Sequence, residues 1–402
     1  MTAATATMDM TANRWRLLLT CLLATFLISG GVATIGIVVP EAAARFGVSA
    51  PSMAATFSWF TVGIFAGNVI SFVLFSYCSI RSVLLVGYGI CAGSLLLIHS
   101  TSSGALLALA LLSYGLSISC VICGAGTLIT QLWDGRARQT ALVAQDAMFN
   151  GGGLLFSAVV TGLVVRSLNF SWLYVLLAAF AVFALLLALL SDFGDGDAGR
   201  TDAAGPQTTE WNLTFVLLGV SLLVFMLGKI SLFVWAPQLI DERFGGTGSG
   251  GLFMSNVFLA AFFGSLAGTW LVTRFAAGLL VYGLVLLSAA ATFGVLRVEN
   301  AALLLPLAIA YGFSVSATFN AYCAHALAKV GVPTHRNVAY LLLMSGLGGA
   351  LAPVVSSRFV TGGDGIASGV LFSLGCTLTV ILLLALSAWS GARRARTLPA
   401  EP

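Results

Sequence analysis

The chain of 402 residues is 59% hydrophobic and 8% charged, and its mean hydropathy is +1.03. A water-soluble globule of this length needs more polar surface than this composition supplies, so we expect the chain to lie in a lipid bilayer. Its net charge of +4 is small and its basic residues are dispersed, which argues against nucleic acid as a partner. The seven cysteines are scattered through apolar runs and indicate no disulfide framework.

Apolar runs long enough to cross a bilayer recur along the whole chain. Each approaches the roughly 20 residues that a membrane-spanning α-helix needs, which is longer than a β-strand. The predicted fold class is therefore an all-α membrane protein with twelve transmembrane helices. In chain order the expected spans are 15–40, 53–78, 83–99, 105–132, 140–165, 172–191, 211–237, 250–272, 276–296, 301–326, 337–360 and 366–390.

One long polar segment, Ser191 to Glu210, divides the spans into two groups of six. Its acidic residues, glycines and proline are typical of a flexible linker. We expect an N-terminal tail at 1–14, a first six-helix half at 15–191, a linker at 192–210, a second six-helix half at 211–390 and a C-terminal tail at 391–402. The first span follows Arg14 and Arg16, is too long for a signal-peptide core, and is expected to be retained.

The two halves are copies of each other at a shift of 197 residues. Gly31 matches Gly228 and Pro40 matches Pro237, and each of these apolar runs is expected to end in a short amphipathic piece closing on Arg-Phe-Gly. The same shift relates Tyr114-Gly115 to Tyr311-Gly312 and Gly151-Gly152 to Gly348-Gly349. Two six-span copies in the same order are related by an axis along the membrane normal, which is the architecture of a transporter that rocks its halves around a central solute.

Basic residues are distributed unevenly between the two sides of the predicted bundle. With both termini cytoplasmic, that side carries twelve of them, and the opposite side carries five: Arg45, Arg166, Arg243, Arg297 and Arg358. This excess predicts that both termini lie in the cytoplasm. The expected location is the inner membrane of a bacterium. The predicted cytoplasmic loops also hold the charges that we expect to act in gating, namely Arg81, Asp134, Arg136, Arg138 and Arg274.

The pattern as a whole resembles the major facilitator superfamily over essentially the full chain. Within it, Gly126 to Arg136, then Gln145-Asp146, then Phe149-Asn150-Gly151 are similar to TsgA-like transporters, which lie near the fucose–proton symporter branch. The resemblance implies a secondary transporter of the major facilitator fold. Span five has no proline after its glycines, unlike antiporters of the superfamily, which favours symport or uniport.

Two departures from that branch limit what the resemblance implies. The fucose branch carries an acidic residue shortly before the proline of the first span and another on the fourth span. Here Gly36 and the stretch from Cys120 to Thr127 supply neither. The signature between spans two and three is reduced to Ser79-Ile80-Arg81. Sugar specificity and the usual proton site are therefore not carried over.

Asp146 is the one carboxylate of the fourteen acidic residues that lies within a predicted span. An ionisable side chain at the bilayer centre costs roughly 2.5 to 3.5 kcal/mol on insertion scales, and its repeat counterpart is Leu343, so the scaffold does not require it. As a functional group it would couple protons or bind a cation by alternating between charged and neutral forms. As a structural group it would pair with Arg136 or Arg138 near the cytoplasmic face. Both interpretations remain open.

Lys229 is the one lysine inside a predicted span, and its repeat counterpart is Val32. It lies eight residues before Pro237, near the expected outer end of span seven and roughly 12 Å from that proline. It is expected to bind an anionic substrate or to exchange with a carboxylate. The alternative is that its long side chain reaches the outer interface.

Polar side chains at helical spacing on spans four and ten predict the walls of a solute cavity. The candidates for substrate binding, beside Lys229, are Asn150, Tyr311, Gln131, Thr127, Tyr322, His325, Asn320, Trp235 and Asn256. Small polar residues also serve tight helix packing in lipid, which is the alternative for several of them. The Cys120 and Cys123 pair has metal-ligand spacing, but buried thiols in apolar helices are usually small hydrophobes, and no metal or cofactor is expected.

The sequence as a whole predicts a monomeric secondary transporter that moves a small polar solute, for which an anion is one option, by alternating access with protons coupled at Asp146. Efflux of a toxic compound or a siderophore-like chelate is the alternative within transport, since Trp59, Phe225, Trp235 and Tyr311 could line an aromatic cavity. A non-transporting sensor or scaffold is the rival from another class, but the linker and tail are too short to form a signalling domain. An enzyme is not expected, because no nucleophile, base and acid come together in a span.

Overall fold

The computed structural model describes residues 3–75, 77–133, 135–193, 211–246, 248–330, 335–363 and 365–397. Within these residues, twelve helices are long and apolar enough to cross a bilayer, which confirms the predicted fold class. They are α1 (Ala3–Phe46), α2 (Ala50–Leu74), α3 (Ile80–Ser100), α4 (Gly104–Leu132), α5 (Gly135–Val165), α6 (Trp172–Leu189), α7 (Leu213–Arg243), α8 (Ser249–Arg274), α9 (Ala277–Arg297), α10 (Leu304–Leu327), α11 (His335–Gly362) and α12 (Ile366–Thr397). A short 3-10 turn, η2 (Ala301–Leu303), precedes α10.

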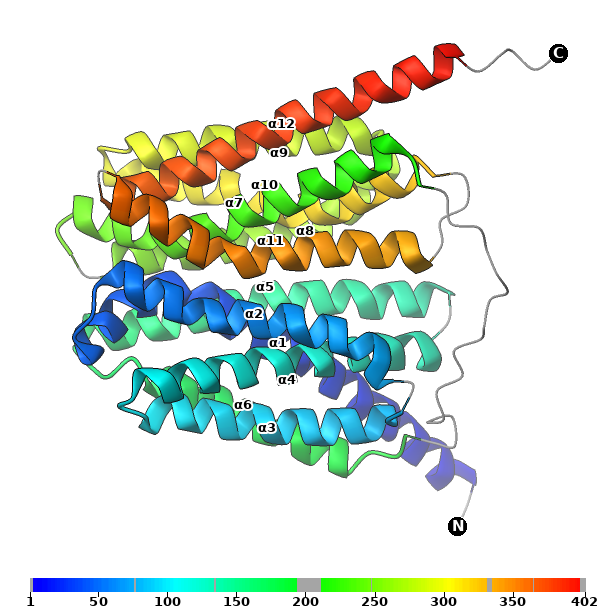
Figure 1. Cartoon of the computed structure of the whole chain (residues 1–402). Helices are drawn as coiled ribbons and strands as arrows, with labels where there is room; N and C mark the ends of the chain where they lie inside the picture. Colours follow the sequence, from blue (N-terminus) through cyan, green and yellow to red (C-terminus); the bar gives the residue numbers. More distant parts are fainter. Residues whose placement is uncertain are drawn as a thin grey trace.

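Helices α1 to α6 form one side of the molecule and α7 to α12 the other (Figure 1). The start of α1 and the end of α12 lie at one end of the bundle, which we call the terminal end, and the opposite end is called the distal end (Figure 1). Large apolar side chains such as Phe263, Leu279 and Leu382 are exposed on the outer surface. An apolar outer surface of this kind is stable only against lipid.

Each half is packed in the same way, so the duplication seen in the sequence is also a duplication of contacts. In the first half α2 packs on α4, α1 on α5 and α3 on α6, and in the second α8 packs on α10, α7 on α11 and α9 on α12. A Cβ on Gly115 would collide with the carbonyl oxygen of Phe60, and a Cβ on Gly312 would collide with that of Val257. Both pairs of positions differ by 197 residues. Glycine is therefore needed at both places because the helix backbones touch there.

The helix boundaries differ from expectation at the two prolines. The short amphipathic pieces predicted after Pro40 and Pro237 are not separate elements, because α1 runs on to Phe46 and α7 to Arg243. Proline is tolerated inside a membrane helix where neighbouring groups satisfy the freed backbone. The residues expected in the N-terminal and C-terminal tails are helical from Ala3 and to Thr397. Most of the predicted linker, residues 194–210, lies outside the described residues.

Candidate functional site

The two halves meet on an axis marked by the crossing of α1 and α7. A Cβ on Gly36 would collide with the carbonyl oxygen of Phe233, and would lie 2.7 Å from that of Val234 and 2.9 Å from the ring of Pro237. Gly36 and Phe233 differ by 197 residues, so they are counterparts in the two copies. A residue can touch its own counterpart only at the pseudo-twofold axis. The α1–α7 crossing therefore locates the centre of the molecule.

Lys229 lies one helical turn from this crossing, on the side of the terminal end. Its Nζ is 5.8 Å from the centre of the Phe233 ring, a cation–π contact, and the side chain is only partly buried. Sixteen residues of α7 precede Lys229 and fourteen follow it. The expectation of a position near the outer end of the span is thus wrong, because α7 continues beyond Pro237. A lysine at the middle of so long a helix is too far from either interface for the side chain simply to reach out.

Aromatic rings close the space between Lys229 and the distal end. The ring of Phe233 lies 5.3 Å from that of Phe258 on α8 and 6.3 Å from that of Tyr311 on α10. Phe258 in turn fills the gap left by Gly153 on α5 and lies 6.3 Å from Phe149. Phe233, Phe258 and Tyr311 are all buried. We call Phe233, Phe258 and Tyr311 the aromatic plug.

Asp146 lies on α5, two helical turns before Gly153 and on the same face. That face packs against α8 at Gly153 and at Thr161, which touches Gly251. At Asp146 the side chain is exposed, as is its repeat counterpart Leu343 on α11. Asp146 lies about one helical turn before Phe149, and Lys229 lies one turn before Phe233; both of these rings pack against Phe258. The two ionisable residues that set the copies apart thus lie beside the same group of rings, although they belong to different halves.

Close contacts between the halves lie at the middle and the distal part of the helices. Besides the contacts at Gly36, Gly153 and Gly251, the hydroxyl of Thr61 on α2 donates to the carbonyl oxygen of Ala350 on α11 at 3.2 Å. Asp146 and Lys229 lie on the terminal side of these contacts. These contacts separate the pair from the distal end.

Comparison with known proteins decides the family. The family model described as Major Facilitator Superfamily matches residues 21–353. The chain belongs to the major facilitator superfamily. It is 24% identical over 383 residues to the protein TsgA homolog of Yersinia pseudotuberculosis serotype O:1b (strain IP 31758), covering 92% of this chain and 95% of the relative. A protein TsgA homolog of Yersinia pestis matches to the same extent.

Solved structures of the superfamily share the fold. The nucleoside transporter NupG superposes with a TM-score of 0.73 at 15% identity, covering 94% of this chain and 98% of the other. A peptide transporter, POT, gives a TM-score of 0.77 at 12% identity, covering 94% of both chains. A bacterial homolog of the human lysosomal transporter Spinster gives 0.71 at 16% identity, covering 96% of this chain and 99% of the other. These identities support the fold and leave the solute open.

In this superfamily member, the remaining predicted site residues on α4, α5 and α8 differ in burial and in hydrogen bonding. Asn150 is buried beside Asp146 and donates its Nδ2 to the Asp146 carbonyl oxygen at 3.0 Å. Thr127 donates back to the Cys123 carbonyl oxygen on its own helix, while Gln131 is exposed one turn further along α4. Asn256 is half-buried on α8. The side chain of Asn320 lies outside the described side chains.

Other predicted site residues are buried inside the second half. Trp235 is fully buried, and its Nε1 donates to the Ser356 hydroxyl at 2.8 Å. The Tyr322 hydroxyl is buried near that of Ser221 on α7, and His325 packs against Gly278 on α9. Phe225 and Tyr311 are buried too, so of the four aromatic residues considered for a cavity wall only Trp59 is exposed. These positions serve helix packing in the observed state.

The predicted gating charges lie at the terminal end. Arg81 is exposed at the start of α3, Arg138 is half-buried near the start of α5, and Arg274 lies 5.8 Å over the Trp270 ring at the end of α8. Asp134 and the side chain of Arg136 lie outside the described part of the chain. No group of three or more His, Cys, Asp or Glu residues that could hold a metal ion occurs among the described residues.

Two functional or structural features were not predicted. Arg45, at the end of α1, donates to the carbonyl oxygens of His99 and Thr101 at the end of α3. Arg243, at the end of α7, donates in the same way to Val295 and Val298 at the end of α9. The repeated Arg-Phe-Gly motif was the available signal. Gln145, next to Asp146, is buried with no partner for its Nε2 among the described residues; its place in the stretch that resembles TsgA-like transporters was the available signal.

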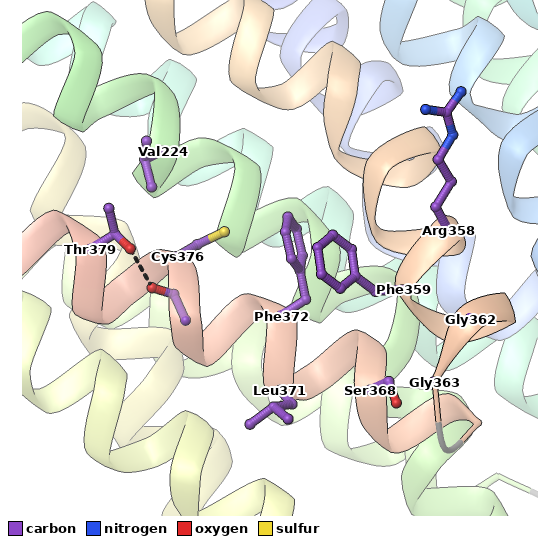
Figure 2. A pocket seen from close by; sticks show the side chains of 11 residues that line it. Val224, Arg358, Phe359, Gly362, Gly363, Ser368, Leu371, Phe372, Cys376 and Thr379 are labelled. Carbon is purple, nitrogen blue, oxygen red and sulfur yellow. Dashed lines mark hydrogen bonds between the residues drawn. The ribbon is translucent and has the colours of Figure 1, made fainter.

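A groove of about 730 Å³ lies away from the axis, between α7, α11 and α12 (Figure 2). The rings of Phe359 and Phe372 stack in it at 4.5 Å, and Phe359 and Leu371 are exposed. Arg358 points away from these rings (Figure 2). This groove opens on the outer, lipid-facing surface, and it is not part of the axial site.

Proposed function

We propose that this chain is a secondary active transporter that moves a small polar solute across the bacterial inner membrane by alternating access, with protons coupled at Asp146. The observation that carries the proposal is the position of two charges next to the axis. Lys229 lies one helical turn from the α1–α7 crossing, with its Nζ 5.8 Å from the centre of the Phe233 ring, and Asp146 of the other half lies on the same terminal side of the contacts between the halves. A rocking transporter has its solute and ion sites between its repeats near the bilayer midplane. Charges are retained there only where they act, because each is costly in lipid.

The positive-inside bias assigns the terminal end to the cytoplasm. In this assignment the aromatic plug and the contacts at Gly36, Gly153 and Gly251 lie on the periplasmic side of Lys229, as expected for an inward-facing state. Rocking would break the contacts at Gly153, Gly251 and Gly36 and expose the pair to the other side. A carboxyl that meets both sides in turn, and that changes between charged and neutral forms, is the group that a proton symporter needs.

The test is accumulation by purified protein in proteoliposomes under an imposed pH gradient, with a solute found by a thermal-shift screen of sugars, organic acids and nucleosides. Asp146→Asn is expected to abolish accumulation against a gradient while counterflow exchange continues, because exchange needs no net proton movement. Glu41→Gln is the matched control, since Glu41 is exposed at the distal end and its repeat counterpart is already Gln238. Accumulation by Asp146→Asn at the wild-type level would overturn the coupling role.

The same experiment addresses the other candidates. Accumulation only when the proton gradient is reversed would assign efflux. Solute binding without any flux in either direction would assign a sensor.

A further inference from the structure

We infer that the solute is a small monoanion, bound at Lys229 in place of Asp146 and carried with one proton in an electroneutral step. This rests on the proposed function, because it assigns the solute class of the same site. It is argued from the position of the two charges and from the charge balance of the space around them.

Among the described side chains, Lys229 and Asp146 give the empty site no net charge. They carry opposite charges, and each lies about one helical turn from a ring, Phe233 or Phe149, that packs against Phe258 next to the axis. Lys229 is held from one side by the Phe233 ring, whose face attracts a cation. Lys229 is only partly buried, and the close contacts at Gly36, Gly153 and Gly251 lie on its distal side. We place the entry of the anion at the terminal end, where it would meet Lys229 in competition with Asp146.

The other charged groups and the histidine among the described side chains of these helices lie toward one end or the other. Toward the terminal end lie Arg138 on α5, Arg274 on α8 and His325 on α10, followed by Lys329 just after α10; toward the distal end lie Glu41 and Arg45 on α1, Asp241, Glu242 and Arg243 on α7, and Arg358 on α11. On α1 no charged residue lies between Arg16 and Glu41. Among the described side chains, the charge balance near the crossing is thus set by Lys229 and Asp146.

Charge balance then selects the solute. A monoanion on Lys229 leaves one excess negative charge while Asp146 is ionised, and a charge without compensation in a low-dielectric space is unfavourable. Protonation of Asp146 removes the excess, so anion binding and proton binding favour each other. A zwitterion would leave the site neutral with Asp146 ionised and would couple no proton. A dianion would leave an excess charge even after protonation.

Binding of the anion together with a proton also leaves the axis without net charge, which we take as the requirement for rocking. In the loaded state Lys229 is paired with the anion and Asp146 is neutral, and in the empty state the two residues pair with each other. Both states carry no net charge at the axis, so both can pass through the closed form. If the anion binds while Asp146 is ionised, the site carries a net charge, and the protein does not pass through the closed form.

The first experiment is a binding screen on purified protein in detergent with probes that share a skeleton and differ in charge. One set is lactate, lactamide, alanine and malonate, and the other is gluconate, gluconamide, glucosaminate and glucarate. Thermal stabilisation by the monoanions lactate or gluconate is expected. Stabilisation only by a neutral, zwitterionic or dianionic probe, or by no probe of either set, would overturn the inference.

The second experiment follows the apparent Kd of the stabilising monoanion against pH. In the wild type, Kd is expected to rise by about tenfold per pH unit once Asp146 is ionised in the free protein. Asp146→Asn is expected to bind with no such dependence, Lys229→Gln to lose binding by at least about tenfold, and Lys229→Arg to retain it. Arg166→Gln is the matched control, because Arg166 is exposed at the distal end. If the Kd of Asp146→Asn depended on pH as the wild-type Kd does, this would contradict the replacement of Asp146 by the anion at Lys229.

These readouts separate the inference from the proposed function. Binding is measured without a gradient, so a neutral or zwitterionic ligand would overturn the monoanion assignment while proton-driven accumulation could still stand. Conversely, Lys229-dependent anion binding with normal accumulation by Asp146→Asn would remove proton coupling and leave the anion site.

Discussion

Gly36 and Phe233 occupy the same position in the two copies of the repeat, and they touch. A Cβ on Gly36 would collide with the carbonyl oxygen of Phe233, so α1 has no room for a side chain at this position. This position lies on the pseudo-twofold axis. Lys229 is one helical turn from Phe233 toward the terminal end, so it lies near the centre of the molecule. The same crossing thus closes the distal side and places the one intramembrane lysine.

Replacing Gly36 by valine is expected to separate α1 from α7 at the distal end. The new side chain would meet the backbone of Phe233 and Val234 and the ring of Pro237, none of which can rotate away, and overpacking of this kind costs about 1–3 kcal/mol. We expect a lower Tm and faster labelling, by a membrane-impermeant maleimide, of a cysteine introduced at Thr161. The exposed Cys78 is replaced by serine in the background.

The control for this prediction is Gly93→Ala. A Cβ at Gly93 meets no atom within 4 Å, so stability and labelling should stay at the wild-type level. Equal labelling of Thr161→Cys with and without Gly36→Val would show that the α1–α7 contact does not hold the distal side closed.

Gly153→Ala is expected to weaken the seal between α5 and α8. A Cβ there collides with the ring of Phe258, and displacing that ring should cost about 1–3 kcal/mol. Adding Phe258→Leu should recover part of the loss, because the smaller side chain leaves room for the methyl group. Thermal unfolding of the two single variants and the double variant measures the coupling, and strictly additive effects would mean that the two residues do not share the contact.

Arg45→Gln and Arg243→Gln are each expected to reduce stability by about 1 kcal/mol, since each guanidinium compensates the carbonyl end of a neighbouring helix. The two variants should act alike, because they remove the same device from each half. Arg166→Gln, at the same end, has none of these carbonyl contacts and should leave the Tm unchanged. An unchanged Tm in both Arg45→Gln and Arg243→Gln would show that water replaces these hydrogen bonds without loss of stability.

Trp235→Phe is expected to lower the Tm while leaving the apparent Kd of the solute unchanged. The substitution removes the indole N–H that donates to the Ser356 hydroxyl in a fully buried place. Loss of this hydrogen bond should reduce the free energy of unfolding by about 1–3 kcal/mol. A changed Kd at an unchanged Tm would return Trp235 to the substrate site that the sequence predicts.

Replacing Cys120 and Cys123 together by alanine is expected to leave transport intact. Cys120 donates weakly to the Gly67 carbonyl oxygen and Cys123 to the Asn68 side chain, so both act in α2–α4 packing. Uptake by proteoliposomes is the measurement, with and without added zinc or copper. A loss of metal-dependent uptake in the double variant would establish a metal site there.

Run length, hydropathy and the 197-residue shift determined the number of helices, their order and the duplication, because a bilayer demands long apolar helices and a repeat preserves the positions where helix backbones touch. The same comparison marked Asp146 and Lys229 as unshared charges. Only the tertiary structure decided that both lie beside the same group of packed rings, Phe149, Phe258 and Phe233, since α5 and α7 are far apart in the chain and belong to different halves.

The tertiary structure also decided which polar residues lie inside a half and which lie near the axis. Periodicity gives the face of a helix and says nothing about the neighbour that the face meets, so Trp235 and Tyr322 could not be distinguished in advance from residues of a cavity wall. The depth of Lys229 depended on whether α7 ends at Pro237. A proline ends many helices in water, but packed membrane helices continue through it, and packing is a property of the folded chain.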